Sequence, residues 1–268
     1  MPPENLDRLS KVYGPTTWRV YARLDVSLDP SGPDQLHERA AQYLRPGDVV
    51  LDAGCRDGEH LIRLVQDNDV IGVGVEPVEI HVERARAAVE AAGLLDRITL
   101  HRGVVHDLPY ADGHFDFVWC RDVLEQVDDL DGALAELRRV MNADARALVY
   151  TTFATDRLDG GDLAMMRRHL GNIQENLDED YVEAAFRRAH LDVERRDAIG
   201  TEWREHAEEH SQIVSKSLLR LSRLRRQRDE ISTAHGQDIY EHIEANLHWE
   251  VFQFLGKLLP VVYTLTAA

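Results

Sequence analysis

Residues 49–58 read VVLDAGCRDG, a short apolar run followed at once by a loop bracketed by glycines. Behind the loop, Leu61, Ile62 and Val65 recur at helical spacing, so the pattern predicts a strand, a tight turn and a helix. Glycine suits such a turn because it adopts backbone angles that other residues avoid and lets a ligand approach without meeting a Cβ atom. The loop therefore stands where strand-to-helix turns of α/β proteins bind ligands.

The alternation of strand and helix continues as far as residue 153. Further short apolar runs, separated by helical patterns or loops, lie at 70–76, 98–100, 115–119 and 145–153. Runs that are nearly continuously apolar are typical of parallel strands covered on both faces. Together with the right-handed crossover rule, they predict an open, doubly wound, mostly parallel α/β sheet.

The composition argues against several classes of partner. The formal net charge of −17 repels nucleic-acid phosphates and anionic membrane surfaces. The most apolar late stretch, 251–265, contains Lys257 and Pro260 and is shorter than the roughly 20 residues of a membrane span. Two cysteines are too few to staple a secreted fold, and no signal-peptide pattern is present at the N-terminus. We therefore expect a cytoplasmic protein with no nucleic acid and no membrane as partner.

A carboxylate at the end of the second apolar run adds to the glycine loop. Glu76 ends the run 70–76 and lies about 18 residues beyond Gly58. An acid at this place accepts hydrogen bonds from the ribose hydroxyls of a nucleoside. A dinucleotide site would explain the loop and the acid equally well.

An ordered set of segments resembles class I S-adenosylmethionine-dependent methyltransferases. The segments that match the family's first motif, adenine loop, fourth strand and following helix are 50–58, 103–110, 115–118, 123–127 and 134–141. The resemblance covers roughly residues 45–153 and is closest to the small-molecule branch of the family. It implies S-adenosylmethionine as the cofactor, no metal, and a small-molecule acceptor methylated on an oxygen, nitrogen or carbon atom.

The same resemblance implies a cofactor site, residue by residue. The residues it places around the methionine end of the cofactor are Asp52, Gly54, Cys55 and Gly58. Glu76 then holds the ribose and Pro77 lies beside the adenine. The residues expected at the adenine edge are Val105 and His106, and those whose carbonyls are expected at the ammonium group are Cys120 and Arg121.

Three positions depart from the family pattern. Arg56 stands where the family commonly has glycine; it fits if its backbone angles are ordinary, with its side chain directed to solvent or to the cofactor's carboxylate. Val104 replaces an acid that often binds the adenine amino group, and Gln126 replaces a histidine found in many relatives. These departures keep open an alternative, a cofactor-binding homologue that transfers no methyl group.

Methyl transfer needs alignment and exclusion of water, and a general base only where the acceptor loses a proton. The candidate catalytic residues are Glu125, just past the fourth strand, and Tyr13, if the N-terminal segment folds over the pocket. Trp18 and Tyr21 would form an aromatic lid over the sulfonium, or simply pack an N-terminal helix.

The resemblance and the helical patterns give a plan for the whole chain. We expect a Rossmann-like cofactor-binding domain in residues 46–200, preceded by an N-terminal helical lid at 1–45, and a sheet of seven strands in all. A helical insertion at 201–257 precedes the final strand at 258–268 and serves as a cap or as the contact of a homodimer. Within the insertion, 206–210 reads HAEEH, the pattern of inverted zinc peptidases; a charged, solvated helix explains it as well.

Overall fold

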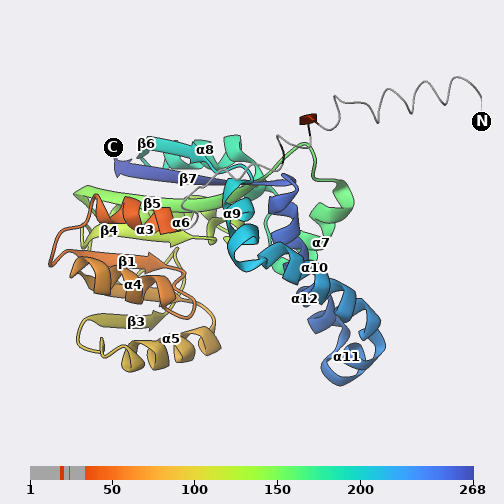
Figure 1. The fold of residues 1–268 in the computed structure, drawn as a ribbon. Helices are drawn as coiled ribbons and strands as arrows, with labels where there is room; N and C mark the ends of the chain where they lie inside the picture. The colour runs from red at the N-terminus through yellow and green to blue at the C-terminus, as the bar shows by residue number, and fades with distance from the viewer. Residues whose placement is uncertain (1–18, 21–23, 25–33) are drawn as a thin grey trace, which may run out of the picture.

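The computed structural model describes residues 19–20, 24 and 34–268, so Tyr13, Trp18 and Tyr21 lie outside the described residues. A seven-stranded sheet in the order β3-β2-β1-β4-β5-β7-β6 forms its centre (Figure 1). The strands are β1 (Val49–Ala53), β2 (Ile71–Glu76), β3 (Ile98–Arg102), β4 (Phe115–Arg121), β5 (Met141–Ala154), β6 (Leu191–Ala198) and β7 (Leu258–Ala267). Neighbouring strands are parallel except β7, which is antiparallel to β5 and β6. The predicted doubly wound, mostly parallel sheet is confirmed.

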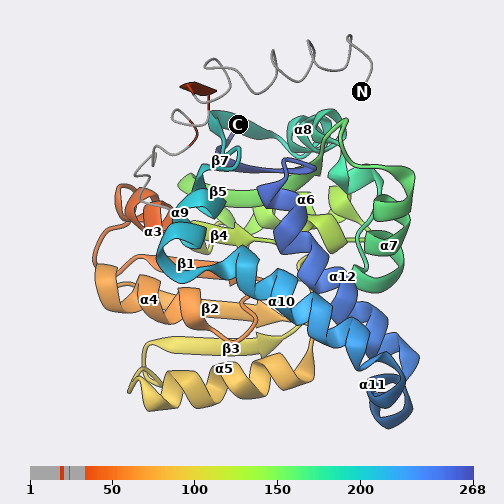
Figure 2. The ribbon, with the colours of Figure 1, turned by 45° about the vertical axis from the view of Figure 1, so that its right-hand side comes forward.

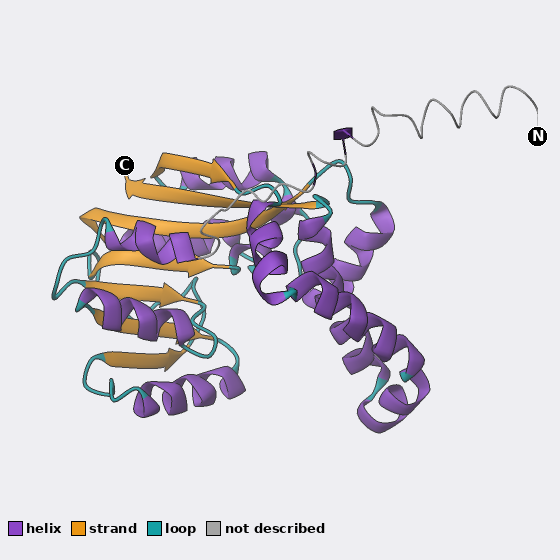
Figure 3. Ribbon diagram, viewed as in Figure 1, coloured by secondary structure: helices purple, strands orange, loops and turns teal. Residues whose placement is uncertain are grey.

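Helices cover both faces of this sheet (Figure 3). One face carries α3 (Asp34–Ala41), α4 (Glu59–Asn68) and α5 (Glu79–Ala91), and the other carries α6 (Leu130–Val140) and α8 (Glu179–Arg188). Val50 and Leu51, neighbours in β1, belong to the two different cores, because successive side chains of a strand point to opposite faces. The interior strands β1, β2 and β4 are therefore mostly apolar, as the sequence pattern indicated.

Four helices lie between β6 and β7: α9 (Glu202–Ser211), α10 (Ile213–Arg226), α11 (Arg228–His235) and α12 (Gln237–Phe254). Figures 1 and 2 show them beyond the carboxyl ends of the parallel strands. α12 packs on α7 (Gly160–Leu170) through Phe252 and Met166. Trp203 of α9 stacks on Tyr150 of β5, with ring centroids 5.9 Å apart. Among the described residues, no helix is long and apolar enough to cross a membrane.

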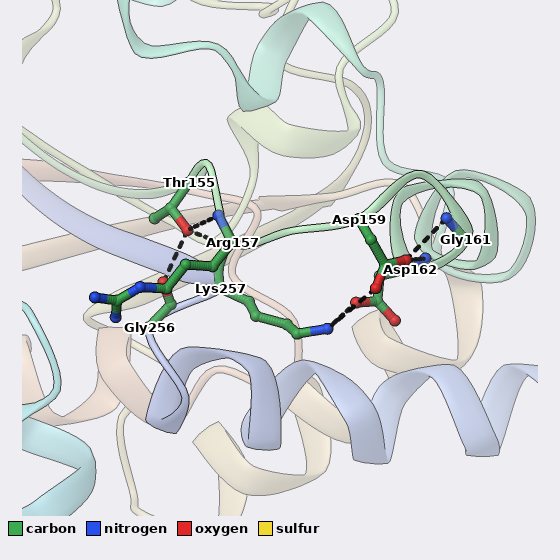
Figure 4. A network of polar contacts seen from close by, with 7 residues as sticks. All are labelled: Thr155, Arg157, Asp159, Gly161, Asp162, Gly256 and Lys257. Carbon is green, nitrogen blue, oxygen red and sulfur yellow. Dashed lines mark hydrogen bonds and ion pairs between the residues drawn. The ribbon is translucent and has the colours of Figure 1, made fainter.

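A polar network fastens the end of this helical segment to the loop after β5 (Figure 4). Thr155 Oγ1 lies 2.8 Å and 3.1 Å from the carbonyl oxygens of Gly256 and Lys257. The Lys257 ammonium contacts the carboxylates of Asp159 and Asp162. Asp159 also caps α7 by accepting two N–H groups of its first turn. The network thus joins α7 to the start of β7, beside the carboxyl ends of the parallel strands.

The cap of α8 gives a first testable prediction on stability. The Asp178 carboxylate accepts the N–H of Tyr181 at 3.1 Å, and α8 buries Val182 and Phe186 completely. Because an N-cap side chain satisfies an otherwise unpaired N–H, Asp178→Ala should lower the free energy of unfolding by about 1 kcal/mol, measured by urea titration. Asp178→Asn keeps an acceptor oxygen and should lose only a fraction of that. Equal losses in both variants would contradict the capping role.

Candidate active site

A cavity of about 470 Å³ opens at the carboxyl ends of β1, β2 and β4. The strand order reverses between β1 and β4, and sheets of this kind bind ligands at such a reversal. The predicted cofactor residues that line the cavity are Asp52, Gly54, Cys55, Arg56, Glu76, Pro77, Val105, His106 and Arg121. The fold therefore brings together residues that lie far apart in the chain, such as Asp52 and Arg121.

Two of the predicted cofactor residues do not line the cavity. Gly58 precedes α4 with a φ of 79°, and a Cβ atom there would lie 3.3 Å from the Ala85 side chain. Its role is therefore to let the loop pass close to α5. Cys120 is 1% exposed inside β4, where burial raises the pKa of its thiol. Cys55 does line the cavity, and burial raises the pKa of its thiol too, so both cysteines are neutral, apolar groups as expected.

Glu125, predicted as a catalytic base, is also not among the residues that line the cavity. It belongs to the short helix η1 (Leu124–Gln126) and is only 2% exposed. Its Oε1 atom accepts the N–H of Thr152 at 2.6 Å, so the carboxyl group points to β5. Burial raises its pKa to about 8, with the Asp122 carboxylate as the next contribution. Glu125 thus stabilises the packing of η1 on β5, and its carboxyl group does not face the cavity.

Backbone hydrogen bonds fix the loop after β1. The N–H groups of Gly54 and Cys55 both donate to the carbonyl of Val75, at 2.8 Å and 3.1 Å. Gly54 has a φ of 81°, and a Cβ atom there would overlap Cγ2 of Val123. Glycine is therefore needed at this position both for its backbone angle and for the close approach of the segment after β4.

Arg56 departs from the expectation of ordinary backbone angles. Its φ is 47°, in the left-handed region that glycine adopts without cost and that costs other residues about 1–2 kcal/mol. In this conformation its N–H points to Oε2 of Glu76, 3.1 Å away. The hydrogen bond to a carboxylate offsets the strain, and the side chain remains exposed at the cavity.

Glu76 is the best-connected carboxylate of the cavity. It is 6% exposed, and Oε1 accepts the N–H of Val78 at 3.0 Å and faces Nδ1 of His81 at 3.1 Å. With the N–H of Arg56 on Oε2, three of the roughly four acceptor positions of the carboxylate are used. One position remains for a ribose hydroxyl, and displacing His81, which also lines the cavity, frees a second.

Asp52 is a buried carboxylate of the cavity with an oxygen that lacks a partner in the described part of the chain. It is 2% exposed, it lines the cavity, and its Oδ2 atom has no hydrogen-bond partner among the described residues. Burial and the nearby Glu76 raise its pKa to about 8. A buried carboxylate left without a donor is costly, and a cationic ligand would relieve that cost. The ammonium and sulfonium groups of S-adenosylmethionine fit this need, as the hydroxyls of its ribose fit Glu76.

The two other departures from the family pattern also lie at the cavity. Val104 lines it and is 36% exposed, so no carboxylate stands at that point of the adenine edge. Gln126 lines it too, but its Nε2 atom donates to the carbonyl of Leu170 at 2.9 Å. Gln126 therefore ties η1 to the end of α7.

Some lining residues were missed by sequence reasoning. They include His60, Trp119 and Asp122. Asp122 directly follows β4 and His60 lies in the first turn of α4, so their positions next to the two motifs were the available signal. Trp119 belongs to an apolar run, and nothing in the sequence distinguishes it from a core residue.

The histidine pattern at 206–210 forms part of α9. The rings of His206 and His210 lie 4.0 Å apart, and Glu208 accepts the N–H of Val214 at 2.7 Å, which supports the start of α10. Within the part of the chain that the structure describes, no group of three or more His, Cys, Asp or Glu side chains is suited to hold a metal ion. The pattern thus has a structural explanation in the helix junction.

Comparisons with known proteins agree with this geometry. Residues 51–149 match the family model described as "Methyltransferase domain". The 27-O-demethylrifamycin SV methyltransferase of Amycolatopsis mediterranei is 31% identical over 142 residues, which cover 52% of each chain. The chain spans between a third and about half of the length of the first three curated relatives that it matches.

Solved structures share the fold at low sequence identity. A geranyl diphosphate methyltransferase in complex with S-adenosylmethionine has a TM-score of 0.64 at 17% identity, covering 87% of this chain and 85% of that one. The [4+2]-cyclase SpnF has a TM-score of 0.67 at 19% identity, covering 87% and 80%. The matched segment 51–149 therefore belongs to the class I S-adenosylmethionine-dependent methyltransferases of the small-molecule type, a family whose cofactor is S-adenosylmethionine.

Proposed function

We propose that this chain transfers the methyl group of S-adenosylmethionine to a small-molecule acceptor bound in the same cavity. The observation that carries the proposal is the pair of buried carboxylates at the ends of β1 and β2. Glu76 has acceptor capacity for hydroxyls, and Asp52 has an unpartnered oxygen for a positive charge. A nucleoside that carries both ribose hydroxyls and a cationic side chain satisfies the two groups at once.

The residues of this chain would contribute binding, alignment and exclusion of water. When bound, S-adenosylmethionine supplies a methyl group already activated by the sulfonium charge. Glu76 would hold the ribose, Asp52 would compensate the positive charge, and the loop at Gly54 would leave room for the methionine end. α9 and α12 lie beyond the strand ends, where they would limit the access of water to the reacting atoms (Figure 1).

Turnover separates the proposal from its alternative, cofactor binding without methyl transfer. The names of the relatives include methyltransferases that act on a rifamycin derivative and on sterols, and a structural neighbour is called a cyclase. Incubation with S-adenosylmethionine and a panel of such acceptors should yield S-adenosylhomocysteine and a product heavier by one methylene group. Tight cofactor binding with no such product from any acceptor would favour the alternative.

The oligomeric state, the cellular location and the lack of nucleic-acid partners are also proposals. We propose a homodimer through the helical insertion, where Leu218, Leu219 and Leu255 are each about half exposed. The cytoplasmic location and the lack of nucleic-acid partners rest on the composition alone. Gel filtration with light scattering on wild type and on Leu218→Lys tests the dimer, which should dissociate in the variant.

Cofactor binding should depend on pH through Asp52. Its pKa of about 8 in the free protein falls when a cation binds beside the carboxylate, so binding below pH 8 releases a proton. Affinity for S-adenosylmethionine should therefore rise between about pH 6 and pH 7.5, below the range in which an α-amino group titrates, by at most tenfold per pH unit. In Asp52→Asn the slope should disappear. Calorimetry in buffers of different ionisation enthalpy measures the released proton directly, and an equal slope in both proteins would contradict this role.

A further inference from the structure

A polar part of the cavity wall lies where β4 ends. Arg121, the last residue of β4, and Asp122, the next residue, both line the cavity. Nε of Arg121 lies 3.3 Å from Oδ2 of Asp122. The Arg121 side chain is 25% exposed and the Asp122 side chain 45% exposed. The pair thus presents one cation and one anion, side by side, to the cavity.

The Arg121 guanidinium is held in a single position. Its Cζ atom lies 5.4 Å from the ring centroid of Tyr150, which itself stacks on Trp203 of α9. Nη1 lies 2.5 Å from Nε2 of His60. Among the described residues, Nη2 has no hydrogen-bond partner, so its N–H groups are available to a ligand.

Two histidines behind Arg121 reinforce this position. A guanidinium only donates, so Nε2 of His60 accepts and the proton of His60 resides on Nδ1. That proton is donated to Nε2 of His37, 3.0 Å away, and both rings pack on Trp119. Burial lowers the pKa of His60 to about 3 and that of His37 to about 4. Both rings are therefore neutral, so they position the guanidinium without electrostatic repulsion.

The backbone of Asp122 is fixed next to β5. Its φ of 55° is unusual for a non-glycine residue, and its N–H donates to the carbonyl of Tyr150 at 3.0 Å. The charged groups around its carboxylate are the guanidinium groups of Arg121 of β4 and Arg204 of α9 and the carboxyl groups of Glu250 of α12 and Glu125 of η1.

We propose that Arg121 and Asp122 form the acceptor subsite and select a hydroxyl acceptor, a phenol or an enol, over an amine or an alkene; this inference rests on the proposed function. A hydroxyl can accept from Arg121 and donate to Asp122 at the same time. The guanidinium stabilises the oxygen as it becomes anionic. Amines and alkenes instead gain positive charge on methylation, and a fixed cation in the wall opposes that change.

Methyl transfer to the hydroxyl conserves both atoms and charge. The hydroxyl proton passes to the Asp122 carboxylate, and the acceptor oxygen forms a bond to the methyl carbon. The carbon–sulfur bond breaks with its electron pair remaining on sulfur, so the sulfonium becomes a neutral thioether. Asp122 is then the general base and releases its proton to solvent after the product leaves.

A chromophoric phenol tests the subsite. The full chain is saturated with S-adenosylhomocysteine and titrated with 4-nitrophenol, whose visible absorption reports the bound phenolate. Wild type and Arg188→Met should bind it alike, because Arg188 forms a matched Arg–Asp pair with Asp131 on the surface. Arg121→Met should bind at least tenfold more weakly, with Arg121→Lys as a second variant should the first not fold. Equal binding by all variants, or none by the loaded wild type, would overturn the proposal; failure to bind S-adenosylhomocysteine would instead overturn the proposed function.

The products and the base give a second readout. From a panel of phenols, amines and alkenes, the methylated products should be ethers, whereas N- or C-methyl products would overturn the proposal. Asp122→Asn should keep the calorimetric affinity for S-adenosylmethionine within about threefold, since asparagine tolerates the same backbone angle. Its rate of ether formation should fall about 100-fold and recover as pH rises and the acceptor ionises unaided. Asp131→Asn is the matched control and should retain the wild-type rate.

Discussion

Glu76→Gln should weaken the binding of S-adenosylmethionine at least tenfold, which corresponds to about 1.4 kcal/mol. The carboxylate accepts two backbone N–H groups, from Arg56 and Val78, and would accept the ribose hydroxyls as well. A glutamine amide of the same size presents an NH₂ group to one of these donors whichever way it is turned. Hydrogen bonds to charged groups contribute about 1.5–3 kcal/mol each, so the loss reaches both the loop and the ligand. Isothermal titration calorimetry measures the affinity.

Glu79→Gln is the matched control for this variant. Glu79 lies three residues further on, in the first turn of α5, where it pairs with Arg102 on the surface and does not line the cavity. Its substitution should leave the affinity unchanged. Glu76→Asp keeps the charge and should lose less than Glu76→Gln. A folded Glu76→Gln protein that binds the cofactor as tightly as wild type would remove Glu76 from the site.

Gly54→Ala should destabilise the protein by about 2–5 kcal/mol and abolish measurable cofactor binding. The positive φ of 81° contributes about 1–2 kcal/mol of this, and the overlap of the new Cβ with Val123 about 1–3 kcal/mol. Both terms act on the loop that shapes the methionine end of the cavity. Urea unfolding measures the loss of stability, and calorimetry measures the loss of binding.

Two further variants separate the cost of the backbone angle at Gly54 from the cost of the overlap with Val123. Gly93 has a φ of 69° with nothing within 4 Å of a new Cβ, so Gly93→Ala should show the backbone cost alone. Val123→Ala in the Gly54→Ala background removes the overlap and should restore part of the stability. Should Gly93→Ala cost as much as Gly54→Ala, the close approach of Val123 would not be the cause.

Most of the sheet was predictable from sequence because its central strands are buried on both faces. The run at 49–53 and the glycine loop after it gave β1 and its turn, and the boundaries of β2 and β4 follow their apolar runs. β6 has no comparable apolar run, since it lies at the edge of the sheet and residues 192–198 are mostly exposed and polar. Only the pairing with β7 makes that segment a strand.

Other elements depend on tertiary contacts that no local pattern encodes. α7 begins with Gly160 and Gly161, which are poor helix formers, so local sequence does not favour a helix there. The Asp159 cap and the packing of Met166 against α12 stabilise it. Likewise, β5 begins at Met141, four residues before the predicted start, because Met141 pairs with Phe115 across a register shift.

Some residues of the candidate site were likewise predictable from the sequence, and others were not. The residues on the glycine loop and at the end of β2 were predictable because their function depends on one strand end each. His60, Trp119 and Asp122 were not, since their arrangement depends on contacts between β4, α4 and α9. Glu125 was misplaced for a related reason: its position after β4 suggested the cavity, but η1 turns its side chain toward Thr152.

The most direct test of the account is a calorimetric titration of the wild-type chain with S-adenosylmethionine and with S-adenosylhomocysteine. The buried carboxylates Asp52 and Glu76 predict one site per chain with micromolar affinity for both ligands, and a proton released on binding below pH 8. Absence of binding to either ligand by a folded protein would show that Arg56 and Val104 have closed the site to this cofactor, and the account of the cavity would fail.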